Sequence, residues 1–284
     1  MKEILNFRVP FEYAHILFAK DEGRIIYDEF GKPSMKEIEL TKNDPRYEQI
    51  PVVEEQIRKK YKCGFFFSWQ FKRQYTKKEI EKAVLFHVLI KHVIGTVGEE
   101  CGTIYDESVS CKICKANPCQ KTPLRLRKRA LPKKDIIRTL SGEIVVSEKF
   151  KKSVEQHGIR GCMFGPVLFG KKVSNFYQLT ATDQLELTPS TVVGCEPFDL
   201  STSYGHEVYK CPNGDTIGLN LLSEPHVFDN PLIYEYGFLE SRQRIGVRRG
   251  VFYPNPIYFA SQAFRTMVEE EKIKGLKFEI THVE

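Results

Sequence analysis

The sequence predicts an α+β protein with mixed or antiparallel sheets and a few short helices. Three observations predict this class: short apolar runs broken by glycine and proline, a strong helix-start signal near residue 76, and a strand–helix–strand pattern that occurs twice. Hydrophobic side chains make up 41% of the 284 residues, which excludes a disordered chain. No apolar run approaches the roughly 20 residues of a membrane helix, so we expect no membrane partner.

Residues 1–100 are expected to form an N-terminal α+β region. Apolar runs in the first 45 residues are typical of the strands of a small sheet. Residues 51–60 suit a short helix with Pro51 in its first turn. Thr76 and Glu79 match a capping box, in which each side chain closes the first turn of a helix. Cysteine density rises near residue 101, so we place a second region at 101–284.

Residues 144–164 resemble residues 258–278 when the two segments are aligned at a constant offset. In each copy a strand ends at a serine that can cap a helix, and a glycine-containing turn leads into another strand. The aligned pairs include Ser147 and Ser261, Phe150 and Phe264, Val154 and Val268, and Gly161 and Gly275. The pattern predicts a repeated β-helix-β element, and a common local order without duplication is the alternative.

Cys111 and Cys114 form a C-x-x-C, a spacing at which one tight turn directs two thiolates toward one zinc ion. Cys211 is expected to be the third ligand, because Cys-Pro followed by Gly is similar to one arm of a zinc knuckle. Asp215 is the expected fourth ligand on spacing alone. Competing fourth ligands are Cys119, Cys195 and His206. A redox pair, ordinary cysteines and an open catalytic zinc position are the alternatives.

A basic segment, residues 121–134, carries seven Lys and Arg side chains and no acid, whereas the whole chain has a net charge of +6. Leucine and arginine alternate over residues 124–127, which predicts a strand with a cationic face. This face suits an acidic protein partner or phosphate, and the alternative is a solvated or internally paired strand. The candidate partner-binding or phosphate-binding residues are Arg125, Arg127, Arg129, Arg248 and Arg249.

Motifs of nucleotide-dependent and triad enzymes are absent from the sequence: it has no P-loop, no G-x-G-x-x-G, no H-E-x-x-H and no G-x-S-x-G. We therefore expect a protein without catalytic activity. An enzyme that uses Asp106, Glu107 and Arg248 in one cleft is the remaining alternative. The N-terminal residues lack the apolar stretch and cleavage site of a signal peptide, so we expect a cytoplasmic protein with reduced thiols.

The run GEECGTIYDESVSCKIC, followed by CPNGDTIGLNLLSE and QRIGVRRGVFYPNPIYFAS, resembles the bacterial double-CxxCG immunity proteins over residues 75–284. The resemblance implies a zinc site and a protein that neutralises a cognate toxin by binding it. Lys115 stands where that pattern has glycine, and Gly214 with Asp215 replaces a cysteine. We expect a zinc-stapled immunity or defence-associated protein, and a nucleic-acid-binding accessory protein that uses residues 121–134 is the alternative.

Overall fold

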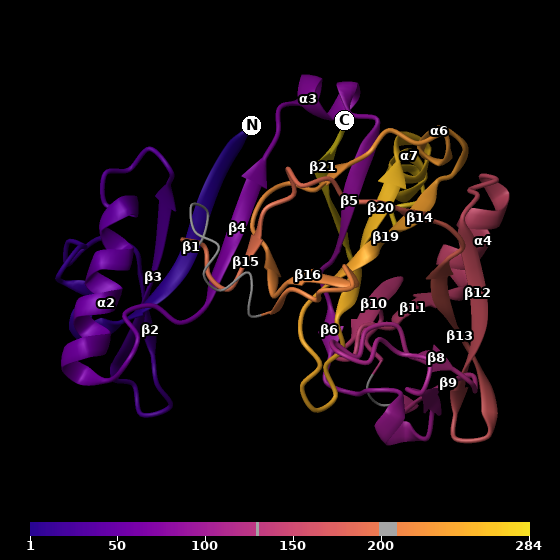
Figure 1. The fold of residues 1–284 in the computed structure, drawn as a ribbon, viewed down its shortest axis with the longest axis horizontal. Coiled ribbons are helices and arrows are strands. Elements are labelled where there is room, and N and C mark those ends of the chain that lie inside the picture. The colour runs from indigo at the N-terminus through magenta and orange to yellow at the C-terminus, as the bar shows by residue number, and fades with distance from the viewer. Residues whose placement is uncertain (129–130, 199–208) are drawn as a thin grey trace. The chain divides into compact units, whose positions relative to one another are not determined.

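The computed structural model describes residues 1–128, 131–198 and 209–284 (Figure 1). They belong to two compact units, Met1–Lys82 and Ala83–Glu284, and each unit is described here by itself. The division comes earlier in the chain than the boundary expected near residue 100. The reason is that residues 85–90 form a central strand of a sheet in the second unit.

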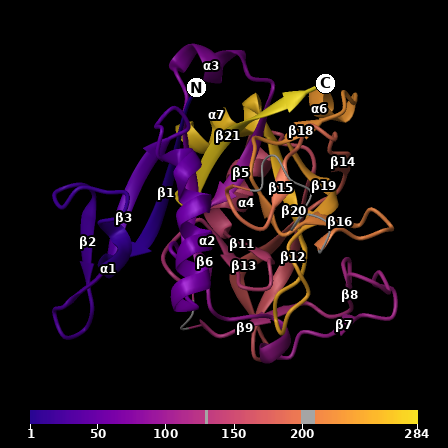
Figure 2. The ribbon, with the colours of Figure 1, turned by 60° about the vertical axis from the view of Figure 1, so that its left-hand side comes forward.

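The first unit is a four-stranded antiparallel sheet in the order β2-β3-β1-β4. Its strands are β1 (Lys2–Pro10), β2 (Arg24–Tyr27), β3 (Pro33–Thr41) and β4 (Trp69–Gln74). The remaining elements are α1 (Phe11–Ala14), the 3-10 helix η1 (Tyr47–Gln49), α2 (Ile50–Tyr61) and α3 (Lys77–Lys82). Helix α2 confirms the helix predicted over residues 51–60, and it lies beside β1 and β3 (Figures 1 and 2).

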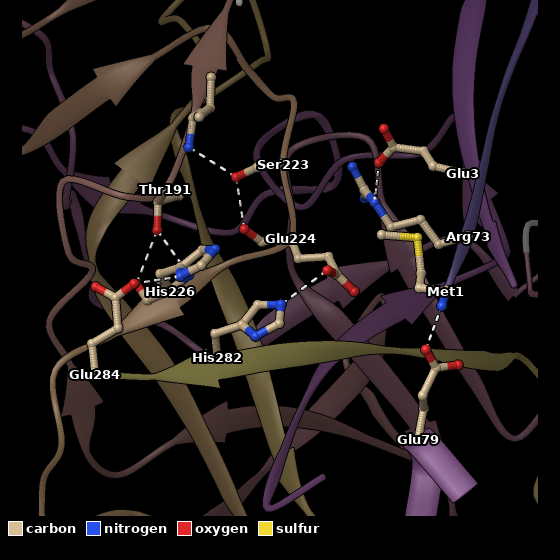
Figure 3. Close-up of polar contacts among 11 residues, drawn as sticks. Met1, Glu3, Arg73, Glu79, Thr191, Ser223, Glu224, His226, His282 and Glu284 are labelled. Carbon is tan, nitrogen blue, oxygen red and sulfur yellow. Dashed lines mark hydrogen bonds and ion pairs between the residues drawn. The ribbon is translucent and has the colours of Figure 1, made fainter. Parts of the chain in front are cut away.

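Helix α3 confirms the predicted capping box. The backbone N–H of Thr76 donates to the Glu79 carboxylate over 2.7 Å, and the backbone N–H of Glu79 donates to the Thr76 hydroxyl over 3.3 Å. The same carboxylate accepts a hydrogen bond from the terminal ammonium of Met1 (Figure 3). The Thr76 hydroxyl also donates to this carboxylate over 2.9 Å. The terminal ammonium, then the Thr76 backbone N–H and hydroxyl, lower the pKa of Glu79 to about 2.

The second unit contains a six-stranded and a seven-stranded sheet. The first has the order β6 (Val93–Ile94), β10 (Ile136–Thr139), β11 (Ile144–Ser147), β13 (Lys172–Ala181), β12 (Cys162–Phe169) and β9 (Leu124–Leu126). The second has the order β14 (Gln184–Leu185), β19 (Phe238–Ile245), β20 (Asn255–Ser261), β5 (Leu85–Ile90), β21 (Leu276–Val283) and β18 (His226–Val227), with β16 (Thr216–Gly218) also paired to β19.

Short elements complete this unit. Two pairs of strands stand outside the large sheets: β7 (Tyr105–Asp106) with β8 (Cys119–Gln120), and β15 (Val193–Gly194) with β17 (Asn220–Leu221). Among the described residues of this unit, the helices are η2 (Glu99–Cys101), α4 (Glu148–Gln156), α6 (Leu232–Glu235) and α7 (Gln262–Glu270). The mixture of short helices with mixed and antiparallel sheets confirms the predicted α+β class.

The repeated element is larger than the sequence indicates. The antiparallel order β10-β11-β13-β12 recurs as β19-β20-β5-β21. The registers agree residue by residue: Val146 is paired with Ile136 and Tyr177, and its counterpart Ala260 is paired with Phe238 and Phe86. We define the first repeat as β10, β11, α4, β12 and β13, and the second as β19, β20, α7, β21 and β5. The duplication thus covers four strands and a helix in each repeat.

The two repeats exchange equivalent contacts, as a pseudo-two-fold axis requires. The rings of Phe150 and Phe264, which are counterparts, meet with centroids 6.1 Å apart. The Asp135 N–H donates to the Lys274 carbonyl over 3.2 Å, and the Gly237 N–H donates to the Arg160 carbonyl over 2.9 Å. Each of the two turns that follow the helices therefore contacts the first strand of the other repeat.

Glycine is required at the turn after each helix. Gly161 has φ of 93° and Gly275 has φ of 122°, values that side chains with a Cβ rarely adopt. A Cβ would lie 2.0 Å from the Phe238 carbonyl oxygen in the first case and 2.5 Å from the Ile136 carbonyl oxygen in the second. Since Phe238 and Ile136 are themselves counterparts, the same close approach occurs twice.

One core joins the repeats. It contains both cap-proximal phenylalanines and the aliphatic residues that follow them, and its members pair across the pseudo-two-fold axis. These pairs include Ile136 with Phe238, Val146 with Ala260, Phe150 with Phe264, Val154 with Val268, and Leu179 with Val88. Separate apolar clusters cover the other faces of the two sheets. Neither repeat buries its helix face alone, which explains why the two occur together.

Candidate metal centre

The first candidate metal-binding loop, residues 107–118, joins β7 to β8 and closes on itself at residues 111–116. The Cys111 N–H donates to the Ala116 carbonyl, and the Lys115 N–H donates to the Cys111 carbonyl, both over 3.0 Å. Lys115 has φ of 58°, in the left-handed region. Glycine adopts this conformation most readily, and the lysine accepts it at a cost of about 1 kcal/mol.

The second metal-binding loop, residues 211–216, has a similar construction. The Cys211 N–H donates to the Thr216 carbonyl over 2.7 Å, and the Gly214 N–H donates to the Cys211 carbonyl over 2.9 Å. Gly214 has φ of 76°, which turns the chain so that Asp215 rather than residue 214 supplies the side chain. The spacing Cys-x-x-x-Asp thus replaces Cys-x-x-Cys in the second arm.

Cys111, Cys114, Cys211 and Asp215 converge, and their ligand atoms all lie within 4.8 Å of one another. The Sγ atoms of Cys111 and Cys211 are 3.6 Å apart. Two sulfurs bound to one tetrahedral zinc at about 2.3 Å each are separated by about 3.8 Å, so this donor set fits a metal ion of that size. The structure therefore brings together the four residues that the sequence analysis selected, and they could hold a metal ion.

Burial and hydrogen bonding act on the thiols in opposite directions. Burial raises the pKa of Cys114 to about 11. Burial also acts to raise the pKa of Cys211, but hydrogen bonds from the backbone of Asn213 and from the thiols of Cys111 and Cys114 outweigh it, and the net shift is downward. The Asn213 side-chain amide additionally donates to Cys111 Sγ over 3.6 Å. Polar donors are thus already directed at the sulfurs.

Arg244 connects both metal-binding loops to β19. Its backbone N–H donates to the Asp215 carbonyl over 2.7 Å, and its Nε donates to Asn117 Oδ1 over 2.7 Å. Its Nη2 also donates to the Glu240 carboxylate over 2.9 Å. Only 9% of this residue is exposed, so the contacts are made in a poorly solvated environment. Arg244 therefore positions the two arms relative to the second repeat.

Glu107 and Arg248 meet, as the enzyme alternative required, and they form an ion pair. Arg248 Nη2 lies 2.7 Å from Glu107 Oε1, and the Tyr253 hydroxyl donates to the same oxygen over 2.9 Å. The Tyr253 and Arg248 hydrogen bonds lower the pKa of Glu107, which keeps it a carboxylate. Asp106 instead lies 3.4 Å from Lys121, and its pKa is lowered first by hydrogen bonds from Ser108. Both carboxylates are thus engaged in contacts that anchor the first metal-binding loop.

The candidate partner-binding arginines differ in exposure. Leu124 and Leu126 are buried in β9, as predicted, while Arg127 is exposed and Arg125 is half-buried. Arg249 is exposed beside the paired Arg248. Residues 129–130 and 199–208 lie outside the described residues, so the predictions for Arg129 and His206 are not addressed. Among the other competing ligands, Cys119 is exposed and Cys195 is partly buried, and neither belongs to the metal cluster.

Two histidine–glutamate contacts could not be predicted from the sequence. His226 Nδ1 lies 2.7 Å from Glu284 Oε1, and His282 Nε2 lies 2.9 Å from Glu224 Oε2 (Figure 3). The two imidazole rings stack with centroids 4.5 Å apart, because β18 pairs in parallel with β21 at these positions. No local spacing in the sequence connects the four residues, so only the strand pairing reveals them.

No protein-family model matches this chain, and a search of curated proteins finds no match either. The resemblance to the double-CxxCG immunity proteins therefore remains a prediction. Within the described residues, no helix is both long and apolar enough to cross a membrane.

Proposed function

We propose that this chain is a zinc-stapled binding protein in which the metal has a structural role. The observation that carries the proposal is the convergence of Cys111, Cys114, Cys211 and Asp215 within 4.8 Å. Three thiolates and one carboxylate are a donor set that suits zinc, and four protein ligands leave no open position for substrate. The ion would join two loops about 100 residues apart in the chain, since the Cys111–Cys211 contact spans 100 residues.

The charges around the cluster support this proposal. Four ionised donors around Zn²⁺ carry a formal charge of about −2, because each ligand binds in its deprotonated form. Lys115, Lys210 and Arg248 line a cavity of about 260 Å³ that also contacts Cys114 and Cys211. Lys115 and Lys210 would offset part of the negative charge of the loaded site, whereas Arg248 already pairs with Glu107. Arg244 supplies the positioning contacts that metal sites need beyond their ligands.

Elemental analysis of protein purified without chelators tests the metal. We expect about one equivalent of zinc in the wild type and in Cys119→Ser, whose sulfur is exposed and outside the cluster. Cys111→Ser is expected to lose the zinc and to unfold at a lower temperature. Less than half an equivalent in the wild type, or full retention by Cys111→Ser, would contradict the proposal.

The proposed partner is a protein toxin, and the support for it is the resemblance described above together with the exposed cations at the end of β9. Arg127 and Lys128 are exposed, and no described residue forms an ion pair with either. The chain as bait, incubated with extract of the native host, should enrich a toxin domain identified by mass spectrometry. Arg127→Glu with Lys128→Glu should reduce its recovery, whereas Arg242→Glu, at an exposed arginine elsewhere, should not.

The same exposed cations favour the alternative, a nucleic-acid-binding accessory protein. A titration with duplex and single-stranded DNA at several salt concentrations separates the two functions. An affinity that falls steeply with salt, and that is lost in the Arg127→Glu/Lys128→Glu variant, would favour nucleic acid over a toxin. Weak binding with no steep salt dependence would remove this alternative.

A further inference from the structure

A cavity of about 500 Å³ lies in the second unit, between β5, β6, β10 and the segments 219–221 and 245–258. Its volume is in the range of sites that hold small molecules. The wall has an apolar part, with contributions from Val88, Ile90, Leu140, Leu221 and Ile257, and a polar part of similar extent. The cavity is separate from the four metal-ligating residues, none of which lines it. It therefore needs an explanation beyond the proposed metal staple.

Arg138, on β10, contributes a positive charge to this wall. Its Nε is fully buried and has no hydrogen-bond partner. Within the described ranges, no carboxylate forms an ion pair with its guanidinium, and Tyr258 lies close enough to interact with it electrostatically. Burial lowers the pKa of the guanidinium. An uncompensated cation in such surroundings is costly, and a bound anion would offset that cost.

In the second repeat, the charged residue at the position equivalent to Arg138 is neutralised within the protein. The counterpart of Arg138 is Glu240, because Arg138 is paired with Ile144 and Glu240 is paired with Tyr258 at matching positions. Glu240 accepts hydrogen bonds from Arg244 over 2.9 Å and from Gln184 over 2.8 Å. The negative charge of Glu240 is therefore balanced within the protein. The positive charge of Arg138 has no such counter-charge among the described residues, and a bound anion could supply one.

A neutral donor lies beside Arg138. Tyr258 lines the same cavity, and its pKa is raised, chiefly by burial, so its hydroxyl keeps its proton. Two amide side chains of the wall are occupied: the Asn255 amide donates to the Tyr253 carbonyl and the Asn220 amide donates to the Cys195 carbonyl. Arg138 and Tyr258 thus offer a fork of N–H groups and one O–H group to a single acceptor, which suits a carboxylate.

We propose that this cavity binds a small organic acid, with its carboxylate on Arg138 and Tyr258 and its apolar body against the aliphatic wall. One guanidinium and one hydroxyl match a singly charged carboxylate better than a doubly charged phosphate ester. The site goes beyond the proposed staple and partner binding, since it uses neither the metal ligands nor the basic segment.

Calorimetric titration of the full chain with three probes tests the site: 3-phenylpropionate, its uncharged amide and phenyl phosphate. We expect the acid to bind at least about tenfold more tightly than the amide, and more tightly than phenyl phosphate. Arg138→Met should remove the preference for the acid. Arg242→Met, which removes an exposed arginine elsewhere on the second unit, should preserve it.

Urea unfolding of the same variants separates binding from folding. Arg138→Met removes a buried charge that has no partner, so its unfolding midpoint should equal or exceed that of the wild type. Any of four results would overturn the proposal: no binding of the acid up to about 10 mM, equal affinity for acid and amide, tighter binding of phenyl phosphate, or a clearly lowered midpoint for Arg138→Met.

Discussion

The two repeats of the second unit share strand order, register, helix caps and close glycine contacts, yet they carry opposite charges at one equivalent position. Glu240 in the second repeat is neutralised by Arg244, which also holds both metal-binding loops. Arg138 in the first repeat has no such partner and lines a cavity. The shared features build the core, and the candidate sites occur where the repeats differ. Duplication here provides a scaffold on which each copy acquires its own chemistry.

The connections between the first two strands of each repeat illustrate the same difference. Strands β10 and β11 are joined by residues 140–143, whereas β19 and β20 are joined by residues 246–254. The longer connection carries Arg248 and Tyr253, which hold Glu107 of the first metal-binding loop. Functional groups thus concentrate in a loop that the other repeat lacks, as expected when a rigid scaffold supports variable loops.

Substitutions in the shared core should have the largest effects on stability, and they test whether the two repeats contribute equally to it. Phe150 and Phe264 are both fully buried, so Phe150→Ala and Phe264→Ala should each lower the free energy of unfolding by about 3–5 kcal/mol. Because their rings touch, the double variant should lose about 1 kcal/mol less than the sum. Urea unfolding measures all three, with the exposed Phe228→Ala as control. A loss for only one phenylalanine would show that the repeats do not share the core equally.

Substitution of Arg244 tests the position at which the two repeats carry opposite charges. Arg244→Met should cost about 3 kcal/mol in unfolding free energy, because Glu240 is left without its cation in a poorly solvated environment. It should also weaken zinc retention about tenfold in competition with a chelator, since both loops lose a positioning contact. Arg242→Met is the matched control, because its pair with Glu186 is half-exposed. Unchanged zinc retention would mean that the loops are positioned without Arg244.

Substitutions of the two helix-capping serines should have the smallest effects, and those effects should be equal in the two repeats. Ser147 accepts from the Phe150 N–H over 3.2 Å, and Ser261 accepts from the Phe264 N–H over 3.3 Å. Ser147→Ala and Ser261→Ala should each cost about 1 kcal/mol in urea unfolding, because each leaves a helix N–H without its acceptor. Ser→Thr at either position keeps the acceptor and should retain most of the stability. Threonine variants as unstable as the alanine variants would exclude capping as the cause.

Local features of this fold could be predicted from the sequence. The helix over residues 51–60, the capping box at Thr76 and the two serine-capped helices all follow from contacts within a few residues. The alternation in residues 124–127 also identified the buried leucines of β9. Such patterns are set by neighbouring residues, and distant parts of the chain do not alter them here.

The features that could not be predicted from the sequence all depend on the pairing of strands that are distant in the chain. The sequence predicts only a strand, a helix and a strand in each repeat, because the fourth strand of the second repeat, β5, comes before the first repeat in the chain. For the same reason residues 83–100 were expected in the N-terminal region, although β5 pairs with β20 and β21. The stacked His226 and His282 likewise depend on the pairing of β18 with β21.

The sequence by itself determined which residues can bind a metal, since C-x-x-C and Cys-Pro-Asn-Gly-Asp specify donor types and tight turns. Only the tertiary structure decided that these turns meet, that Asp215 joins the three cysteines, and that Arg244 rather than Arg138 finds a partner. The physical reason is that turn geometry depends on the dihedral angles of a few adjacent residues. The meeting of side chains about 100 residues apart depends instead on sheet register and on the packing of the shared core.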